Sequence, residues 1–73
     1  SDGGAQGRNQ VMRATFSIVK RLLASNQISL KNIGIVHSRE FIEAVLRIEF
    51  YDEESMKSAI EILRKHRYVI YER

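Results

Sequence analysis

Residues 41–52 read FIEAVLRIEFYD, and residues 53–64, which follow at once, read EESMKSAIEILR. In the first stretch the apolar side chains take every second position, which is the period of a half-buried strand: Ile42, Ala44, Leu46, Ile48 and Phe50. In the second stretch the apolar residues recur at helical spacing: Met56, Ala59, Ile60 and Leu63. Because the strand passes directly into the helix, both are expected to cover one core. The junction predicts an α+β fold.

The N-terminal part of the chain changes character at Val11. Residues 1–10 contain three glycines and no large apolar side chain, which predicts a flexible linker or an expression scar before a single domain at 11–73. From Val11 onward a helical stripe runs through Met12, Phe16, Val19 and Leu23, and Ile18 and Leu22 widen it. This pattern predicts a first helix that ends near Ser25-Asn26, since asparagine tolerates the left-handed conformation that closes helices.

Residues 28–37, ISLKNIGIVH, alternate twice with a phase slip between the two halves. Ile28 and Leu30 set the first phase, and Ile33 and Ile35 set the second. A bulge near Asn32 reconciles them, so the strand proper is expected to begin near Lys31. Residues 37–40 then form a turn short enough for a hairpin with the strand that follows.

The helix after residue 52 has complementary ends. Asp52 is placed to cap it, acidic residues fill its first turn, and the basic run 64–67 closes it. Residues 68–71, YVIY, are β-branched and aromatic and predict a third strand. A right-handed crossover would place both helices on one face, giving a two-layer ferredoxin-like sandwich in the order α-β-β-α-β. So small a sheet leaves an open edge that another chain could pair with.

The composition argues against catalysis and metal binding. The 73 residues include no cysteine, and the two histidines, His37 and His66, fall in different regions, whereas a zinc site needs three or four converging ligands. No serine lies in a nucleophile elbow, and the glycines of residues 3–7 do not follow a strand. We expect no catalytic residue, metal or cofactor. No segment reaches the roughly 18 apolar residues of a membrane span, so we expect no insertion into a membrane by this chain.

Two candidate contact surfaces remain. Apolar and aromatic side chains on the back of the sheet, on the first helix and near the C-terminus predict a protein interface: Phe16, Phe41, Val45, Tyr51, Tyr68 and Tyr71. A net charge of +3 and the basic residues Arg64, Lys65 and Arg67, followed by two tyrosines, are also compatible with RNA contact. Helix capping explains the same basic charges without RNA.

The spacing Ile28-x-Leu30-x-x-Ile33-x-Ile35, a short turn, Ala44-x-Leu46-x-Ile48-x-Phe50, an acidic helix start, Leu63 and a terminal Val69 resembles a known family. It is similar to the small C-terminal periplasmic domain of the type II secretion L-type inner-membrane protein and its pilus-biogenesis relatives. The resemblance covers Met12 to Arg73. It implies no enzymatic activity, homodimerisation or pairing with a protein of similar fold, and a place on the periplasmic side of the bacterial inner membrane. Some members continue into a further strand beyond the position of Arg73.

Three functional hypotheses follow. The first is a non-enzymatic interaction or dimerisation module of a larger assembly, such as a secretion or pilus machine. The second is a ligand-sensing regulatory domain, because the element order also resembles ACT-type domains and the cytoplasmic domain of cation diffusion transporters. The third is an RNA-binding module acting through Arg64, Lys65 and Arg67.

Overall fold

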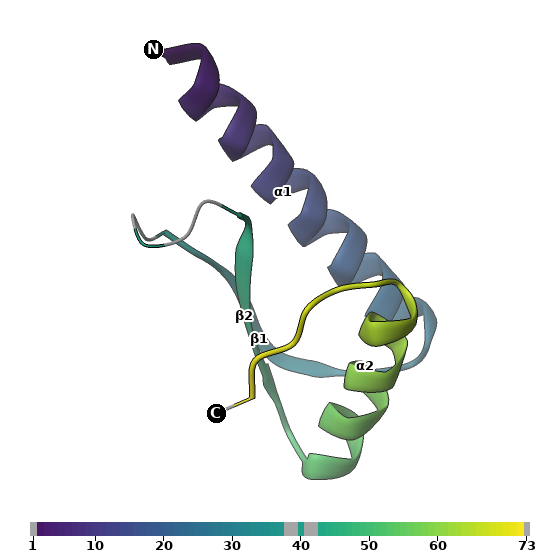
Figure 1. The fold of residues 1–73 in the computed structure, drawn as a ribbon. Helices are drawn as coiled ribbons and strands as arrows, with labels where there is room; N and C mark the ends of the chain where they lie inside the picture. Colours follow the sequence, from purple (N-terminus) through teal and green to yellow (C-terminus); the bar gives the residue numbers. More distant parts are fainter. Residues whose placement is uncertain (1, 38–39, 41–42, 73) are drawn as a thin grey trace.

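The computed structural model describes residues 2–37, 40 and 43–72. The elements follow the order α1 (Asp2–Ser25), β1 (Leu30–Val36), β2 (Val45–Phe50) and α2 (Glu53–Lys65). The two strands form an antiparallel hairpin, and both helices pack on the same side of it (Figure 1). The α+β class is confirmed.

Helix α1 begins earlier than we expected. It starts at Asp2, so residues 2–10, for which we predicted a flexible segment, continue the helix (Figure 1). No proline interrupts the segment, and extending a helix that is already nucleated fixes fewer torsion angles per hydrogen bond than starting one. The predicted stripe is confirmed, since Met12, Val19 and Leu23 are buried and Phe16 is half-buried. Ile18 does not widen that stripe, because it is 55% exposed.

The hairpin carries the predicted bulge. Ile33 pairs with Ile48 and Ile35 with Leu46, and the register then shifts between Leu30 and Asn32 so that Leu30 pairs with Phe50. The extra residue, Lys31, returns Leu30 to the side of the sheet that Ile33 occupies. Strand β1 therefore contributes Leu30 and Ile33 to the same core although they are three positions apart.

The core is small. Four buried side chains from the two helices form its centre, namely Val19, Leu23, Ala59 and Leu63. Leu30 and Ile33 of β1 and the core-facing residues of β2 pack against them from the sheet, and Tyr68 and Ile70 pack against them from the C-terminal segment. Because the same cluster receives side chains from every element, the described residues form one hydrophobic unit.

The third strand that we predicted for residues 68–71 does not form. Within the described part of the chain the sheet has two strands, and residues 68–72 carry no regular secondary structure. Tyr68 and Ile70 face the core while Val69 and Tyr71 are 74% and 84% exposed, so the alternation of a strand is present. A strand also requires a backbone partner, and among the described residues the amides of 69–72 donate to no carbonyl. The α-β-β-α part of the predicted order is observed without its last strand.

Both helices close with the same hydrogen-bonding motif. After α1, the amide of Ile28 donates to the carbonyl of Leu23 and that of Gln27 to Ala24, each at 3.0 Å. After α2, Tyr68 donates to Leu63 at 3.0 Å and Arg67 to Arg64 at 2.9 Å. This is the Schellman pattern, in which one residue adopts a left-handed conformation. That residue is Gln27 in α1, where we expected Asn26.

Candidate functional site: an open sheet edge and its flanking groove

The structure disperses the six predicted interface residues. Phe41 lies outside the described residues. Tyr51 and Tyr71 are 69% and 84% exposed, as an interface requires. Val45 pairs with Val36 on the side of the sheet away from the helices and is half-buried.

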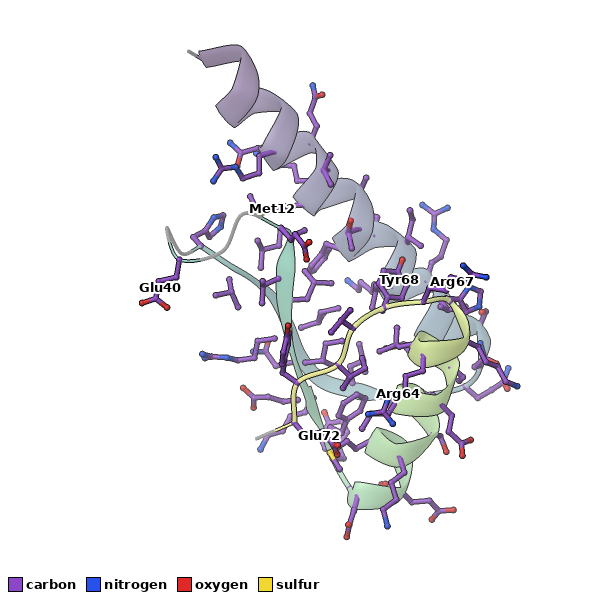
Figure 2. All side chains as sticks on the ribbon, in the orientation of Figure 1. Met12, Glu40, Arg64, Arg67, Tyr68 and Glu72 are labelled. Carbon is purple, nitrogen blue, oxygen red and sulfur yellow. The ribbon has the colours of Figure 1, made fainter. Side chains whose placement is uncertain are left out.

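Tyr68 and Phe16 are less exposed than we predicted for interface residues. Tyr68 is half-buried and packs against the core, because the Schellman motif turns the chain back over the end of α2 (Figure 2). Phe16 is half-buried on the side of α1 that faces β1. Tyr68 therefore contributes to the core and its availability to a partner is limited, whereas Phe16 lines an open groove beside β1.

The three predicted RNA-contact residues sit at the C-terminal end of α2. Arg64 and Lys65 occupy the last turn, and Arg67 adopts the left-handed conformation with φ 68°. Figure 2 shows Arg64 beside the helix and Arg67 at the turn beyond it. Because Tyr68 packs into the core, Tyr71 alone of the two neighbouring aromatic rings remains exposed for stacking on a base.

Among the described residues, Asp52 at the beginning of α2 has a pKa that its hydrogen bonds shift. The backbone amide of Ser55 donates to Asp52 Oδ1 at 2.7 Å, which confirms the predicted cap. That backbone hydrogen bond, together with one from the Ser55 side chain, lowers the pKa of Asp52 below its ordinary value of 3.8. The shift stabilises the helix end and has no link to a reactive group.

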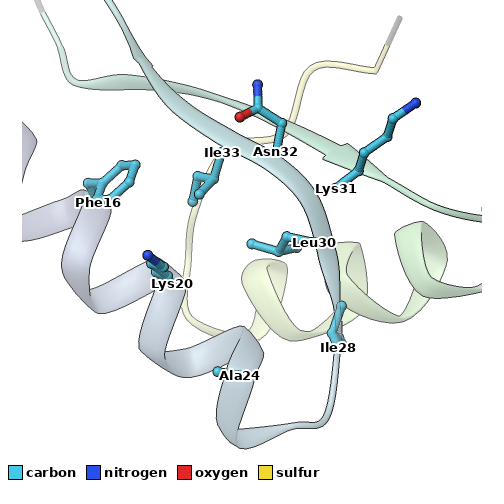
Figure 3. Close-up of a pocket in the computed structure, with 8 residues that line it drawn as sticks. All are labelled: Phe16, Lys20, Ala24, Ile28, Leu30, Lys31, Asn32 and Ile33. Carbon is cyan, nitrogen blue, oxygen red and sulfur yellow. The ribbon is translucent and has the colours of Figure 1, made fainter.

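A groove lies between α1 and the outer edge of β1. Figure 3 shows its eight lining residues: Phe16, Lys20 and Ala24 from α1, and Ile28, Leu30, Lys31, Asn32 and Ile33 from the chain entering and forming β1. The floor is apolar, Lys20 stands on the α1 side, and the side chain of Lys31 projects from β1 away from α1 (Figure 3). Both are exposed, and Lys20 Nζ lies 5.9 Å from the centre of the Phe16 ring.

This groove runs along an edge of the sheet that is open in the described structure. Strand β1 pairs with β2 on one side, and among the described residues no strand pairs with its other side. The backbone groups that point outward from β1 are therefore available to an added strand. The sequence pattern missed the groove, although the spacing Phe16-Lys20-Ala24 on one helix face and the bulge residue Lys31 were the signals that could have located it.

In the described part of the chain, no group of three histidine, aspartate or glutamate side chains is placed to hold a metal ion. None of the described helices has both the length and the apolar character that crossing a bilayer requires. Comparison with models of known protein families, with curated proteins and with solved structures gives no match.

Proposed function

We propose that this chain is a non-enzymatic α+β interaction module whose two-stranded sheet is completed by another polypeptide. The observation that carries the proposal is the unfinished sheet. Within the described residues both strands have an unpaired edge, and the amides of residues 69–72 have no backbone partner.

The exposed apolar side chains support the same proposal. Tyr51, which follows β2, and Val69 and Tyr71, which follow α2, are each at least 69% exposed. Burying such side chains is favourable by about 25 cal/mol per Å² of apolar surface. A partner that covers these three side chains would gain the free energy of burying them and the backbone hydrogen bonds of an open edge.

The wider setting rests on the resemblance described above. A domain of that secretion family implies a homodimer, or a paired protein of similar fold, in a membrane-associated protein-transport complex on the periplasmic side. We extend this setting to the chain as part of the proposal, since a domain of that kind acts by binding and carries no reaction of its own.

Sedimentation equilibrium over a wide concentration range tests the proposal, together with chemical crosslinking in the native host. We expect self-association or a specific crosslinked partner. Tyr71→Ser should weaken that association without lowering the melting temperature, because Tyr71 is 84% exposed. Glu61→Ser, on the exposed side of α2, is the matched control and should change neither. A strict monomer that yields no crosslinked partner would overturn the proposal.

A further inference from the structure

We infer that the outer face of α1 binds the surface of an anionic membrane, with its apolar side chains among the lipid headgroups and without spanning the bilayer. The inference goes beyond the proposed function, because it concerns a helix face and not the sheet. The occupant of this face is a lipid surface with net negative charge.

One long side of α1 has no other element against it (Figure 1). Exposed residues recur on this helix at intervals of three or four positions, which places them on one face, here called the outer stripe: Arg8, Val11, Ala14, Ile18 and Arg21. Val11 and Ile18 are 59% and 55% exposed although both are large and apolar. An open hollow beside Ile18 is lined by Arg21 and Leu22 as well.

The charge of α1 is of one sign. From residue 7 to residue 25 its sequence contains four basic residues and no acidic one, and all four are exposed: Arg8, Arg13, Lys20 and Arg21. In the described structure Arg8 and Arg21 form no ion pair. Aliphatic side chains with a cation at each end are typical of helices that lie in a membrane interface, where the cations meet lipid phosphates. The outer stripe therefore favours an anionic partner.

A second copy of the chain is a poor partner for the outer stripe. Antiparallel pairing of two α1 helices around Ala14 would bring Arg8 of one copy toward Arg21 of the other. Parallel pairing would bring each arginine beside its own equivalent. Either arrangement places like charges together without an acidic residue of the stripe to offset them.

The size of the stripe favours a lipid surface over an acidic protein. From Arg8 to Arg21 the stripe is about 20 Å long and about 10 Å wide, or roughly 200 Å², whereas a stable protein interface buries about 800 Å² per partner. Binding to an anionic membrane needs no such area, because each basic residue near the surface adds its own attraction. Nucleic acid is also disfavoured, since Phe16, the one aromatic residue of α1, faces β1 and leaves no ring on the stripe to stack on a base.

The test measures cosedimentation of the full chain with sucrose-loaded vesicles at low salt. Vesicles of one part phosphatidylglycerol to two parts phosphatidylcholine are compared with vesicles of phosphatidylcholine alone. We expect a partition coefficient about tenfold higher on the anionic vesicles, and a loss of binding as added salt screens the charges.

A fluorescent dye shows which face meets the lipid. The chain contains no cysteine, so one introduced cysteine can carry an environment-sensitive dye. The emission of a dye at A14C, in the outer stripe, should shift to the blue when anionic vesicles are added. A dye at E61C, on the exposed side of α2, should not shift.

Loss of the apolar side chains should weaken binding. We expect V11S with I18S to lower the partition coefficient on anionic vesicles about tenfold, because less apolar surface enters the headgroup layer. V69S, which removes a valine that is 74% exposed in the C-terminal segment, is the control and should bind as the parent. All these side chains are exposed, so each variant should keep the melting temperature of the parent.

Loss of the stripe arginines should weaken binding further. R8Q with R21Q should lower the partition coefficient about 25-fold, or about fivefold for each basic residue at an anionic surface. R64Q with K65Q, at the end of α2, makes the same change in net charge and should change binding much less. The comparison separates a specific helix face from a general attraction between opposite net charges.

Five results would overturn this inference. They are equal binding to both kinds of vesicle, binding that V11S with I18S leaves unchanged, equal losses from the two charge variants, no blue shift at A14C, and tighter binding of an oligouridine RNA that R8Q with R21Q weakens. The last result would assign the outer stripe to nucleic acid. None of the five bears on the sedimentation experiment, so this inference can fail while the proposed function stands.

Discussion

The backbone amide of Tyr68 donates a hydrogen bond to the carbonyl of Leu63 at 3.0 Å, and the side chains of both residues lie in the same hydrophobic core. This bond can form only because Arg67, between them, adopts a left-handed conformation with φ 68°. An L-residue with a Cβ atom is strained there, whereas glycine is not. The C-terminal segment is therefore held on the core at a cost in backbone strain.

Replacing Arg67 with glycine should stabilise the protein. We expect R67G to raise the free energy of unfolding by about 1 kcal/mol, because it removes the Cβ penalty of the left-handed region. Urea denaturation followed by circular dichroism measures the change. E61G is the control, because it places glycine in the interior of α2, where the backbone is helical. It should lower the free energy of unfolding by about 0.5–1 kcal/mol. A destabilised R67G would mean that the Arg67 side chain itself contributes more than the strain.

The cap of α2 predicts a specific response to acid. Because the pKa of Asp52 is lower in the folded protein than its ordinary value of 3.8, its ionised form stabilises the fold. That contribution is complete above the ordinary pKa and is lost as the pH falls through the folded pKa. Thermal melts between pH 7 and pH 2.5 should show this loss in the parent chain. D52N keeps an oxygen acceptor but does not titrate, so an equally steep acid loss in D52N would contradict the assignment.

Leu23 should be the most sensitive core position. It is fully buried at 0% exposure, and its truncation would leave a cavity between α1, the sheet and α2. We expect L23A to cost about 2–5 kcal/mol, which approaches the whole stability of a domain this small. I18A, on the same helix at 55% exposure, is the matched control and should change the denaturation midpoint little. Equal effects of the two variants would show that α1 packs through a different face.

Gly34 offers a site for stabilising β1. A Cβ built at this position meets nothing within 4 Å, and the residue pairs with Arg47 on the solvent side of the sheet. We expect G34T to raise the free energy of unfolding by about 0.5–1 kcal/mol. Glycine in a strand interior loses more backbone entropy on folding than other residues, and it has no side chain to pack on its neighbours. Chemical denaturation measures it. A loss of stability in G34T would show that a neighbouring group approaches this backbone in solution.

Local signals predicted the parts of the fold that local chemistry determines. The Asp52 cap and the buried face of α2 follow from side chains within one or two turns of each other. The phase slip around Asn32 predicted the bulge, because a strand with one buried face cannot change phase without an extra residue.

The features that sequence reasoning missed depend on distant groups. Residues 68–71 have the composition of a strand, but strand formation depends on a backbone partner that the described chain does not provide. The groove likewise combines Phe16 of α1 and Ile33 of β1, and its position follows from the packing of the helix on the hairpin. Sequence reasoning found an open edge without finding which side chains surround it.

The bulge also has a consequence for solubility. An extended, flat and apolar strand edge is a template on which copies of a protein stack into fibres. Here the extra residue breaks the straight run of β1 near its beginning and places the cation of Lys31 there. Copies approaching one another along this edge meet an irregular backbone and a like charge, so the edge resists stacking into a fibre although no strand covers it among the described residues.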